Sequence, residues 1–187
     1  RSTLFPYTTL FRSQGRLCAE DMIGRLSNGG KVAILQGLAG AAQSEGRTAG
    51  AKTVFEGTQG IELVAVQPCD WDATLAYDAT KAIIQANPDL KGIFACNDVM
   101  ALAAVEALKA EGKNDVLVYG VDFTADAKTS IENGEMMGSM TYSSAIYTKA
   151  AMLYAMKLVQ GQTVEGPIYS PITLVNQDNV GDFNGWK

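Results

Sequence analysis

Apolar positions along the chain fall into short continuous runs separated by longer stretches in which they recur at helical spacing. The short runs have the length of buried strands and occupy residues 31–36, 61–66, 92–96, 115–121 and 136–141. Helical spacing covers residues 42–56, 74–86, 99–111 and 125–133. Strands alternating with helices in this way predict βαβ units. We therefore expect a doubly wound α/β fold, with a mainly parallel sheet and helices on both faces.

The pattern changes near both ends of the chain. Before the first strand, Cys18, Met22 and Leu26 share one helical face, and the Ser-Asn-Gly-Gly sequence at 27–30 ends that helix. After the last alternating strand, residues 145–159 form a long apolar helix rich in Ala, Met and Tyr. Residues 169–175 are predicted to form one more strand, which Pro171 would place at a sheet edge.

The first residues differ in character from the rest. Residues 1–13, RSTLFPYTTLFRS, begin and end in Arg-Ser and lack the charged-then-apolar order of a signal peptide. They resemble a translated sequencing adapter, so we expect this segment to be non-native and either disordered or opportunistically packed. On this interpretation the native sequence starts near Gln14, and a signal sequence has been lost by truncation. A Thr- and aromatic-rich edge strand is the alternative.

Composition excludes several kinds of chemistry. The 187 residues include 20 acidic and 15 basic side chains, for a net charge of -5, which disfavours a nucleic-acid partner. The chain has no histidine, so triads with an imidazole base and histidine-based zinc or iron sites are excluded. The three cysteines, Cys18, Cys69 and Cys96, have no CxxC spacing and are expected to be small buried residues. We expect no catalytic residues, no metal and no cofactor.

Polar and aromatic residues follow the predicted strands, where ligands bind in open α/β sheets. The candidate ligand-binding residues are Arg47, Trp71, Asn97, Asp122 and Tyr142. Guanidinium, amide and carboxylate groups match vicinal hydroxyls, and an indole can lie against the C–H face of a sugar ring. The chain has no P-loop and no G-x-G-x-x-G sequence, so a neutral polyol is the favoured ligand.

Each candidate also has a purely structural interpretation. Asn97, like Asp70, Asp72 and Asp98, stands just before a predicted helix, where Asn and Asp commonly act as N-caps. Trp71 suits ordinary packing, and Arg47 suits an exposed helix position. The binding interpretation depends on these side chains converging at one rim of the sheet.

At these residues the chain resembles the periplasmic sugar-binding proteins of the ribose-binding type, the substrate-binding subunits of ABC importers. The matching sequences are KVAILQGLAG from Lys31, QPCDWD from Gln67, GIFACNDVMAL from Gly92 and VLVYGVD from Val116. They lie between Lys31 and Asp122 and are distributed over that whole part of the chain. The resemblance implies a pentose or hexose ligand, a membrane permease as partner, with a chemoreceptor as a further candidate, and no enzymatic activity. It also implies an extracytoplasmic location, either in the periplasm or as a membrane-anchored lipoprotein.

The resemblance also assigns roles to residues and segments. Arg47 matches the sugar-binding arginine, Trp71 the aromatic that stacks on the sugar ring, and Asn97 and Asp122 the groups that hold ring hydroxyls. Tyr142 stands where ribose binders have a glutamine, which leaves the sugar open. Such proteins have two lobes, and the sequence here starts with the first helix of the second. Residues 14–142 would then be the second lobe, 143–163 a helix of the absent first lobe, and 164–187 a return strand with the C-terminal tail.

Two other functions remain open. Transcription regulators of the lac-repressor type share this fold and bind effectors in the same place. They usually have a longer Val-Pro-x-Asp segment where this chain has Gly-Lys-Asn-Asp at 112–115, which favours transport. An enzyme on a flavodoxin-like sheet is the third possibility, because a fold does not fix a function.

Overall fold

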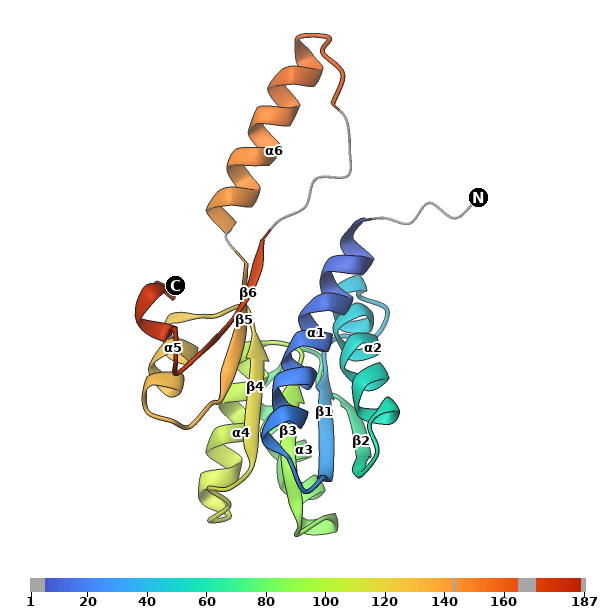
Figure 1. Ribbon diagram of the computed structural model, residues 1–187, viewed down its shortest axis with the longest axis vertical. Helices are drawn as coiled ribbons and strands as arrows, with labels where there is room; N and C mark the ends of the chain where they lie inside the picture. The colour runs from blue at the N-terminus through green and yellow to red at the C-terminus, as the bar shows by residue number, and fades with distance from the viewer. Residues whose placement is uncertain (1–5, 143, 165–170, 186–187) are drawn as a thin grey trace.

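The computed structural model describes residues 6–142, 144–164 and 171–185, apart from the side chains of residues 6–8, 142 and 144–147. The strands are β1 (Gly30–Gln36), β2 (Ile61–Pro68), β3 (Leu90–Ala95), β4 (Leu117–Val121), β5 (Gly138–Tyr142) and β6 (Ile172–Asn176). The helices are α1 (Pro6–Arg25), α2 (Ala42–Gly57), α3 (Ala73–Ala86), α4 (Asp98–Ala110), α5 (Ala125–Glu132) and α6 (Ser144–Val159), with a short 3₁₀ helix at Val180–Asp182. Figure 1 shows their arrangement.

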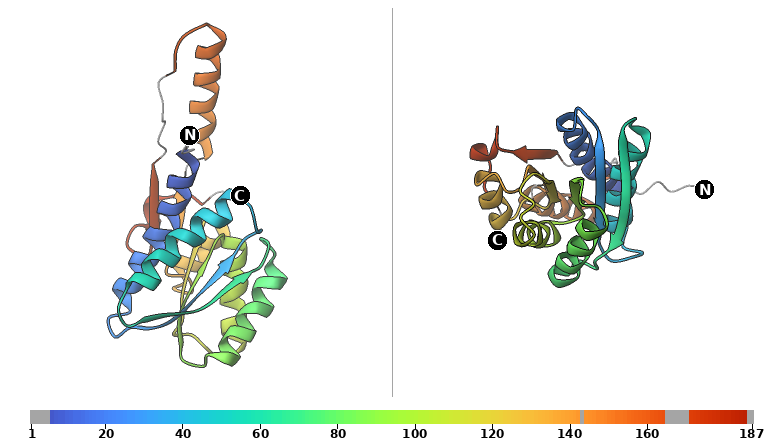
Figure 2. Two further views of the ribbon diagram at one scale, coloured as in Figure 1. Left: turned by 90° about the vertical axis from the view of Figure 1, so that its right-hand side faces the viewer. Right: turned by 90° about the horizontal axis from the view of Figure 1, so that it is seen from below.

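The strands form one sheet in the order β2-β1-β3-β4-β5-β6, parallel except for β6, which pairs antiparallel with β5. Helices α1 and α2 pack together on one face, and α3 and α4 pack together on the other (Figure 2). The sequence prediction of a doubly wound α/β fold is thus confirmed. The chain goes from β1 outward to β2 and then returns to β3 on the other side of β1. Such a switch point opens a ligand crevice at the carboxyl ends of the strands.

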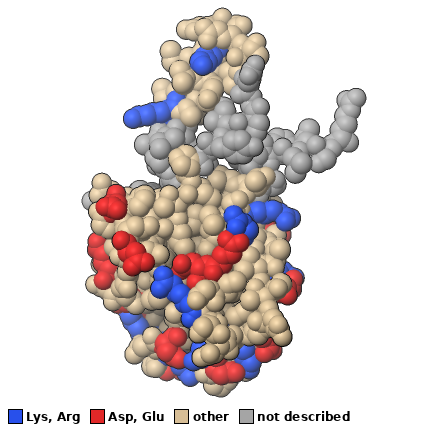
Figure 3. Space-filling model, viewed as in Figure 1, with Lys and Arg blue, Asp and Glu red and all other residues tan. Residues whose placement is uncertain are grey.

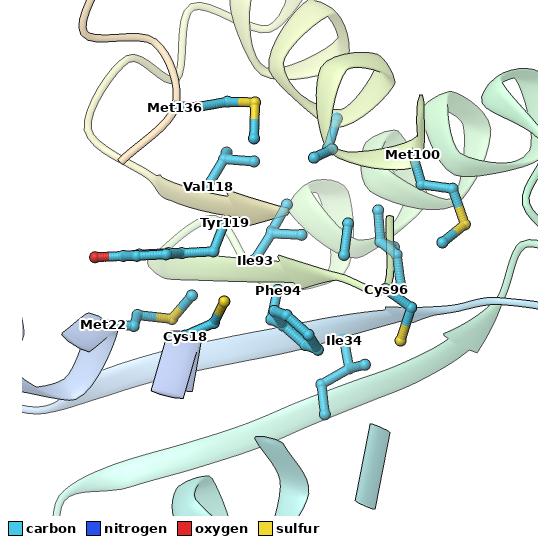
Figure 4. Close-up of a cluster of buried hydrophobic side chains, with 14 of the residues drawn as sticks. Cys18, Met22, Ile34, Ile93, Phe94, Cys96, Met100, Val118, Tyr119 and Met136 are labelled. Atoms are coloured by element: carbon cyan, nitrogen blue, oxygen red, sulfur yellow. The ribbon is translucent and has the colours of Figure 1, made fainter. Parts of the chain in front are cut away.

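The core lies between the central strands and the helices on both faces (Figure 4). Ile34, Phe94 and Tyr119 from neighbouring strands are fully buried, as are Met22 of α1 and Met100 of α4. All three cysteines are free and buried, as predicted. β2 differs from the prediction of a buried strand because it is an edge strand, and most of its side chains are only half-buried.

The N-terminal helix begins at Pro6, within the segment that we expected to be disordered or opportunistically packed. The alternative of an edge strand for the first residues is therefore wrong for 6–13, because helical geometry lets this segment pack along α2. The two helices approach closely: a Cβ on Gly46 would crowd the side chain of Phe11, and one on Gly50 would overlap the backbone of Arg12. The non-native origin of residues 1–13 stays a prediction.

Helix α6 stands apart from the layered domain and projects beyond the carboxyl edge of the sheet (Figures 1 and 2). The part of α6 that is visible in Figure 3 is mostly uncharged. The exposed apolar residues on this helix are Met152, Leu153, Met156, Leu158 and Val159, with exposed fractions from 52% to 89%. Within the described residues, no helix combines the length and apolar character needed to cross a membrane.

Candidate functional site

A hollow of about 230 Å³ opens at the carboxyl edge of the sheet, beside the switch point. The side chains that line it come from separate segments of the chain: Gln43, Arg47, Trp71, Asn97 and Asp122. Four of the five predicted site residues therefore converge in one place. The fifth, Tyr142, is the last residue of β5, and its side chain lies outside the described residues, so its role stays a prediction.

Arg47 of α2 is the anchor of the site, with 4% of its surface exposed. Its guanidinium donates to Gln14 Oε1 at 2.9 Å, to the Cys96 carbonyl at 2.7 Å and to Asp122 Oδ1 at 3.2 Å. The interpretation of Arg47 as an exposed helix charge is wrong, because α1 covers it and these partners hold it. A guanidinium has five N–H groups, so this arrangement leaves donors for a ligand in the hollow.

Asp122 follows β4 and forms an ion pair with Arg47. Burial raises the pKa of the Asp122 carboxyl, and the neighbouring guanidinium of Arg47 partly offsets this by favouring the charged form. The pair brings no net charge to the hollow, which suits a neutral ligand better than a phosphate or carboxylate.

Trp71 lies in the loop between β2 and α3 with its indole ring against Gly37, the residue after β1. A Cβ on Gly37 would overlap the ring, so glycine there makes room for the indole. Trp71 is half-buried: it packs on the domain and also lines the hollow. Packing and ligand contact, which the sequence left as alternatives, are compatible in this position.

Backbone strain accompanies two of the site residues. Trp71 has φ 66° and the preceding Asp70 has φ 52°, whereas Asp122 has φ 111° and the following Phe123 has φ 56°. Non-glycine residues in this region cost about 1–3 kcal/mol each and gather at functional sites. The other described residues with positive φ are all glycines, so the strain is confined to the two loops that present Trp71 and Asp122.

Asn97 is the N-cap of α4, where its Oδ1 accepts from the Met100 amide at 3.0 Å. Capping fixes the side chain and turns its Nδ2 group away from the helix end. Within the described residues that nitrogen has no hydrogen-bond partner, so it is a donor available to the hollow. Asp72 caps α3 by accepting from the Leu75 amide at 2.8 Å and does not line the hollow.

Two residues of the site, Gln43 and Gln14, were not among the candidates from the sequence. Gln43 lies four residues before Arg47 on α2, and this helical spacing could have identified it as a neighbour. Gln14 is fully buried on α1 and orients Arg47 from behind. No local sequence signal connects it to Arg47, because the contact depends on how α1 packs against α2.

A buried carboxylate lies behind the site. Asp98, the first residue of α4, is fully buried and accepts from Ser139 Oγ and the Thr124 amide, both at 2.7 Å. Burial raises the pKa of Asp98 to about 7, against the opposing effect of these hydrogen bonds. From the sequence, this residue follows a predicted strand and is a possible cap, but it was not among the candidate ligand-binding residues.

The chemistry of the hollow is suited to a polyhydroxylated ligand. It offers guanidinium and amide donors, a carboxylate acceptor and an indole face, which together match hydroxyls on one side and C–H groups on another. Among the described residues no group of three or more acidic or cysteine side chains is placed to hold a metal ion.

Comparison with known proteins supports the same interpretation. The family model of the periplasmic binding protein domain matches residues 7–163, which includes part of the segment predicted to be non-native. The D-allose-binding periplasmic protein of Escherichia coli K12 is 39% identical over 126 residues, 67% of this chain and 40% of that protein. The ribose import binding protein of Bacillus subtilis 168 is 32% identical over 163 residues, 87% of this chain and 52% of that protein. The chain thus spans about half the length of these curated relatives.

A solved structure resembles this chain closely. An ABC transporter periplasmic solute binding protein from Actinobacillus succinogenes 130z, determined with bound D-allose, superimposes with a TM-score of 0.88 at 30% sequence identity. The match covers 92% of this chain and 62% of that one. It therefore includes most of the structure described above and leaves more than a third of the neighbour without a counterpart here.

Proposed function

The chain belongs to the periplasmic binding protein domain family, and from this premise we propose that it forms one wall of the sugar site in the substrate-binding subunit of an ABC importer. The ligand is a monosaccharide, either a pentose or a hexose. The observation that carries the proposal is the convergence of Arg47, Trp71, Asn97 and Asp122 on one hollow at the switch point. The function is capture and delivery of the sugar without chemical conversion.

Each residue has a distinct task in this proposal. Arg47 and Asp122, already paired at 3.2 Å, donate to and accept from vicinal hydroxyls, and they need little reorganisation when the sugar arrives. Asn97 adds a donor whose direction the α4 cap has fixed. Trp71 lies against the apolar face of the ring. Gln43 reaches the same hollow from α2 and is a further candidate for hydroxyl contacts.

The opposite wall would come from a first lobe outside this sequence. Relatives extend well beyond the matched region, and a pocket that buries 70–90% of its ligand needs walls on both sides. The sugar would bridge the lobes, closure would bury it, and the permease would recognise the closed form, as would a chemoreceptor where one is used. This places the protein outside the cytoplasm, in the periplasm or anchored as a lipoprotein.

Helix α6 would belong to that first lobe, with residues 143–163 crossing over and 164–187 returning to the sheet described here. The exposed apolar side chains of α6 support this assignment, because an apolar stripe of this kind needs a partner surface. Strand β6 pairs with β5 at the sheet edge, as expected of a returning segment.

Calorimetric titration tests the proposal with a protein extended upstream through the first lobe. We expect micromolar or tighter binding of D-ribose, D-allose or a similar monosaccharide. Arg47→Ala should weaken binding by about 2 kcal/mol or more, about thirtyfold, because it removes a buried charged donor and its ion pair with Asp122. Lys52→Ala, on the exposed face of the same helix, is the matched control. Failure of every monosaccharide to bind would contradict the proposal.

The extended protein also separates transport from the alternatives. A signal peptide or lipoprotein sequence upstream of the first lobe supports an importer subunit. A helix-turn-helix there would instead indicate a regulator of the lac-repressor type. Conversion of the sugar during the titration, detected by chromatography of the recovered ligand, would indicate an enzyme.

A further inference from the structure

The loop that carries Asp122 is fixed by hydrogen bonds along its whole length. The amide of Asp122 donates to the Met140 carbonyl at 2.9 Å, and the amide of Phe123 donates to Ser139 Oγ at 3.0 Å. The amide of Thr124 donates to Asp98 Oδ2 at 2.7 Å. Three consecutive amides are thus held by partners on β5 and on the first turn of α4.

Two of these partners are connected to each other. Ser139 donates its hydroxyl to Asp98 Oδ1 at 2.7 Å while its oxygen accepts from Phe123, so the hydroxyl hydrogen has a defined direction. Both side chains are fully buried. Gly120 of β4 makes room for this arrangement, because a Cβ there would overlap Asp98 Oδ1. The Asp98 carboxylate and the Ser139 hydroxyl thus lie together behind the loop, in space that glycine at position 120 leaves open.

The loop needs such support because its backbone is strained. Asp122 and Phe123 both have positive φ values, which side-chain-bearing residues seldom adopt. Strain of this kind persists only where the surrounding structure enforces it. The ion pair between Asp122 and Arg47 depends on this backbone geometry, because the backbone sets the direction of the Asp122 side chain.

We propose that Asp98 and Ser139 are positioning residues for the ligand-binding Asp122. They hold the strained turn from behind and keep the carboxylate of Asp122 against Arg47, facing the hollow. Neither residue lines the hollow, so both act through the loop. The structural part of the proposal stands by itself, and only its consequence for sugar affinity rests on the proposed function.

The chemistry of Asp98 suits this task. The site behind the loop contains two donors, the Thr124 amide and the Ser139 hydroxyl, and Asp98 in its ionised form accepts both through separate oxygens. An asparagine would present an N–H group to one of them and lose that bond. Ser139 needs both its donor and its acceptor, a combination that threonine retains and alanine does not.

Amide hydrogen exchange on this chain, read residue by residue, tests the structural part. Ser139→Ala should accelerate exchange at Phe123 by about tenfold or more, and Asp98→Asn should do the same at Thr124, relative to Val118 in β4. Ser139→Thr should restore slow exchange because it keeps the hydroxyl. Ser130→Ala is the matched control: Ser130 is a buried serine on α5 that bonds Glu135, away from this loop.

Unchanged exchange at Phe123 in Ser139→Ala would overturn the proposal. The proposal would also be overturned if Ser139→Ala accelerated amide exchange equally in β4 and in the loop, since that result indicates a general loss of stability. Because Ser139→Ala removes no charge, it remains informative if Asp98→Asn does not fold.

Sugar titration of the extended protein then tests the consequence for binding. Ser139→Ala should weaken monosaccharide affinity about tenfold, while Ser139→Thr and Ser130→Ala leave it within about twofold. A loosened loop with unchanged affinity would overturn the positioning role. In a further outcome, the unsubstituted protein binds no monosaccharide while the exchange measurements still show a loosened loop in Ser139→Ala. That combination would contradict the proposed function but not the proposal that Asp98 and Ser139 hold the loop.

Discussion

Helices α4 and α6 are both rich in apolar residues, but most of those of α4 are buried and most of those described on α6 are exposed. Met100, Ala104 and Leu108 of α4 are buried against the sheet and α3, whereas Met152, Met156 and Val159 of α6 are mostly exposed. The amino-acid pattern predicts both helices equally well. What differs is burial: α4 packs against the sheet and α3, whereas these α6 side chains are exposed in the described structure, so an apolar stripe predicts a helix better than it predicts burial.

Hydrogen exchange measures this contrast most sharply. We expect amides of β1 and β3 to exchange only through global unfolding, at a cost of about 5–15 kcal/mol, and those of α6 to exchange with little protection. The reason is that, within the described residues, the apolar side chains of α6 from Met152 to Val159 are exposed. Equal protection of α6 and the central strands would contradict the interpretation of α6 as a helix without its partner lobe.

Truncation of buried side chains extends the comparison to stability. Phe94→Ala in β3 should lower the free energy of unfolding by about 3–5 kcal/mol, because it leaves a cavity in the core. Met156→Ala on α6 should change it by no more than about 0.5 kcal/mol. Denaturant titration measures both. A large loss from Met156→Ala would show that α6 packs against the domain in solution.

The sheet and the helices packed on it also contain a pH-sensitive group, the buried carboxyl of Asp98, and α6 has no such group among its described residues. The pKa of Asp98 is about 7 in the folded protein, above the ordinary value for an aspartate in an unfolded chain, so the folded state binds its proton more tightly. Protonation of Asp98 therefore contributes to the free energy of unfolding, on the order of 1–4 kcal/mol. This contribution is complete below about pH 4 and is lost as pH rises through about 7. Burial also raises the pKa of the nearby Asp122, which contributes with the same sign, against the opposing effect of Arg47.

Asp98→Asn should flatten this dependence, and chemical denaturation between pH 4.5 and about 8 measures it. Asp115→Asn is a suitable control, because Asp115 is exposed and its ion pair with Lys91 lowers the pKa of the Asp115 carboxyl. An unchanged slope in Asp98→Asn would mean that another group dominates the pH dependence.

The smallest predicted effect concerns the rim of the site. Trp71→Ala in the extended protein should weaken sugar binding, since it removes the stacking surface for the ring. The lost aromatic contact costs about 0.5–1.5 kcal/mol in addition to the free energy of the apolar area that is no longer buried. Asp72→Ala, one residue further along, should instead lower stability by about 1 kcal/mol through the lost α3 cap and leave affinity unchanged. If Trp71→Ala leaves affinity unchanged in a folded protein, Trp71 serves packing alone.

Sequence reasoning predicted the strand and helix order and brought Arg47, Trp71, Asn97 and Asp122 to one edge, because parallel strands place their carboxyl ends together. It did not identify Gln14 or the support from Asp98 and Ser139. Those contacts depend on how α1 packs on α2 and on strained backbone at Asp122, which no local pattern encodes. It also assigned no helix to residues 6–13, which form the first turns of α1: proline is tolerated at a first helical turn, and this segment packs along α2.

Nuclear magnetic resonance titration of this chain with a monosaccharide tests the central claim, that the hollow is one wall of a sugar site. With D-allose and D-ribose at up to hundreds of millimolar, we expect weak, saturable shifts confined to Arg47, Trp71, Asn97 and Asp122 and their neighbours. The open-chain polyol D-mannitol should produce much smaller changes, because it lacks the ring that the indole and the paired charges match. Shifts of equal size with mannitol, or shifts centred elsewhere on the domain, would contradict the account.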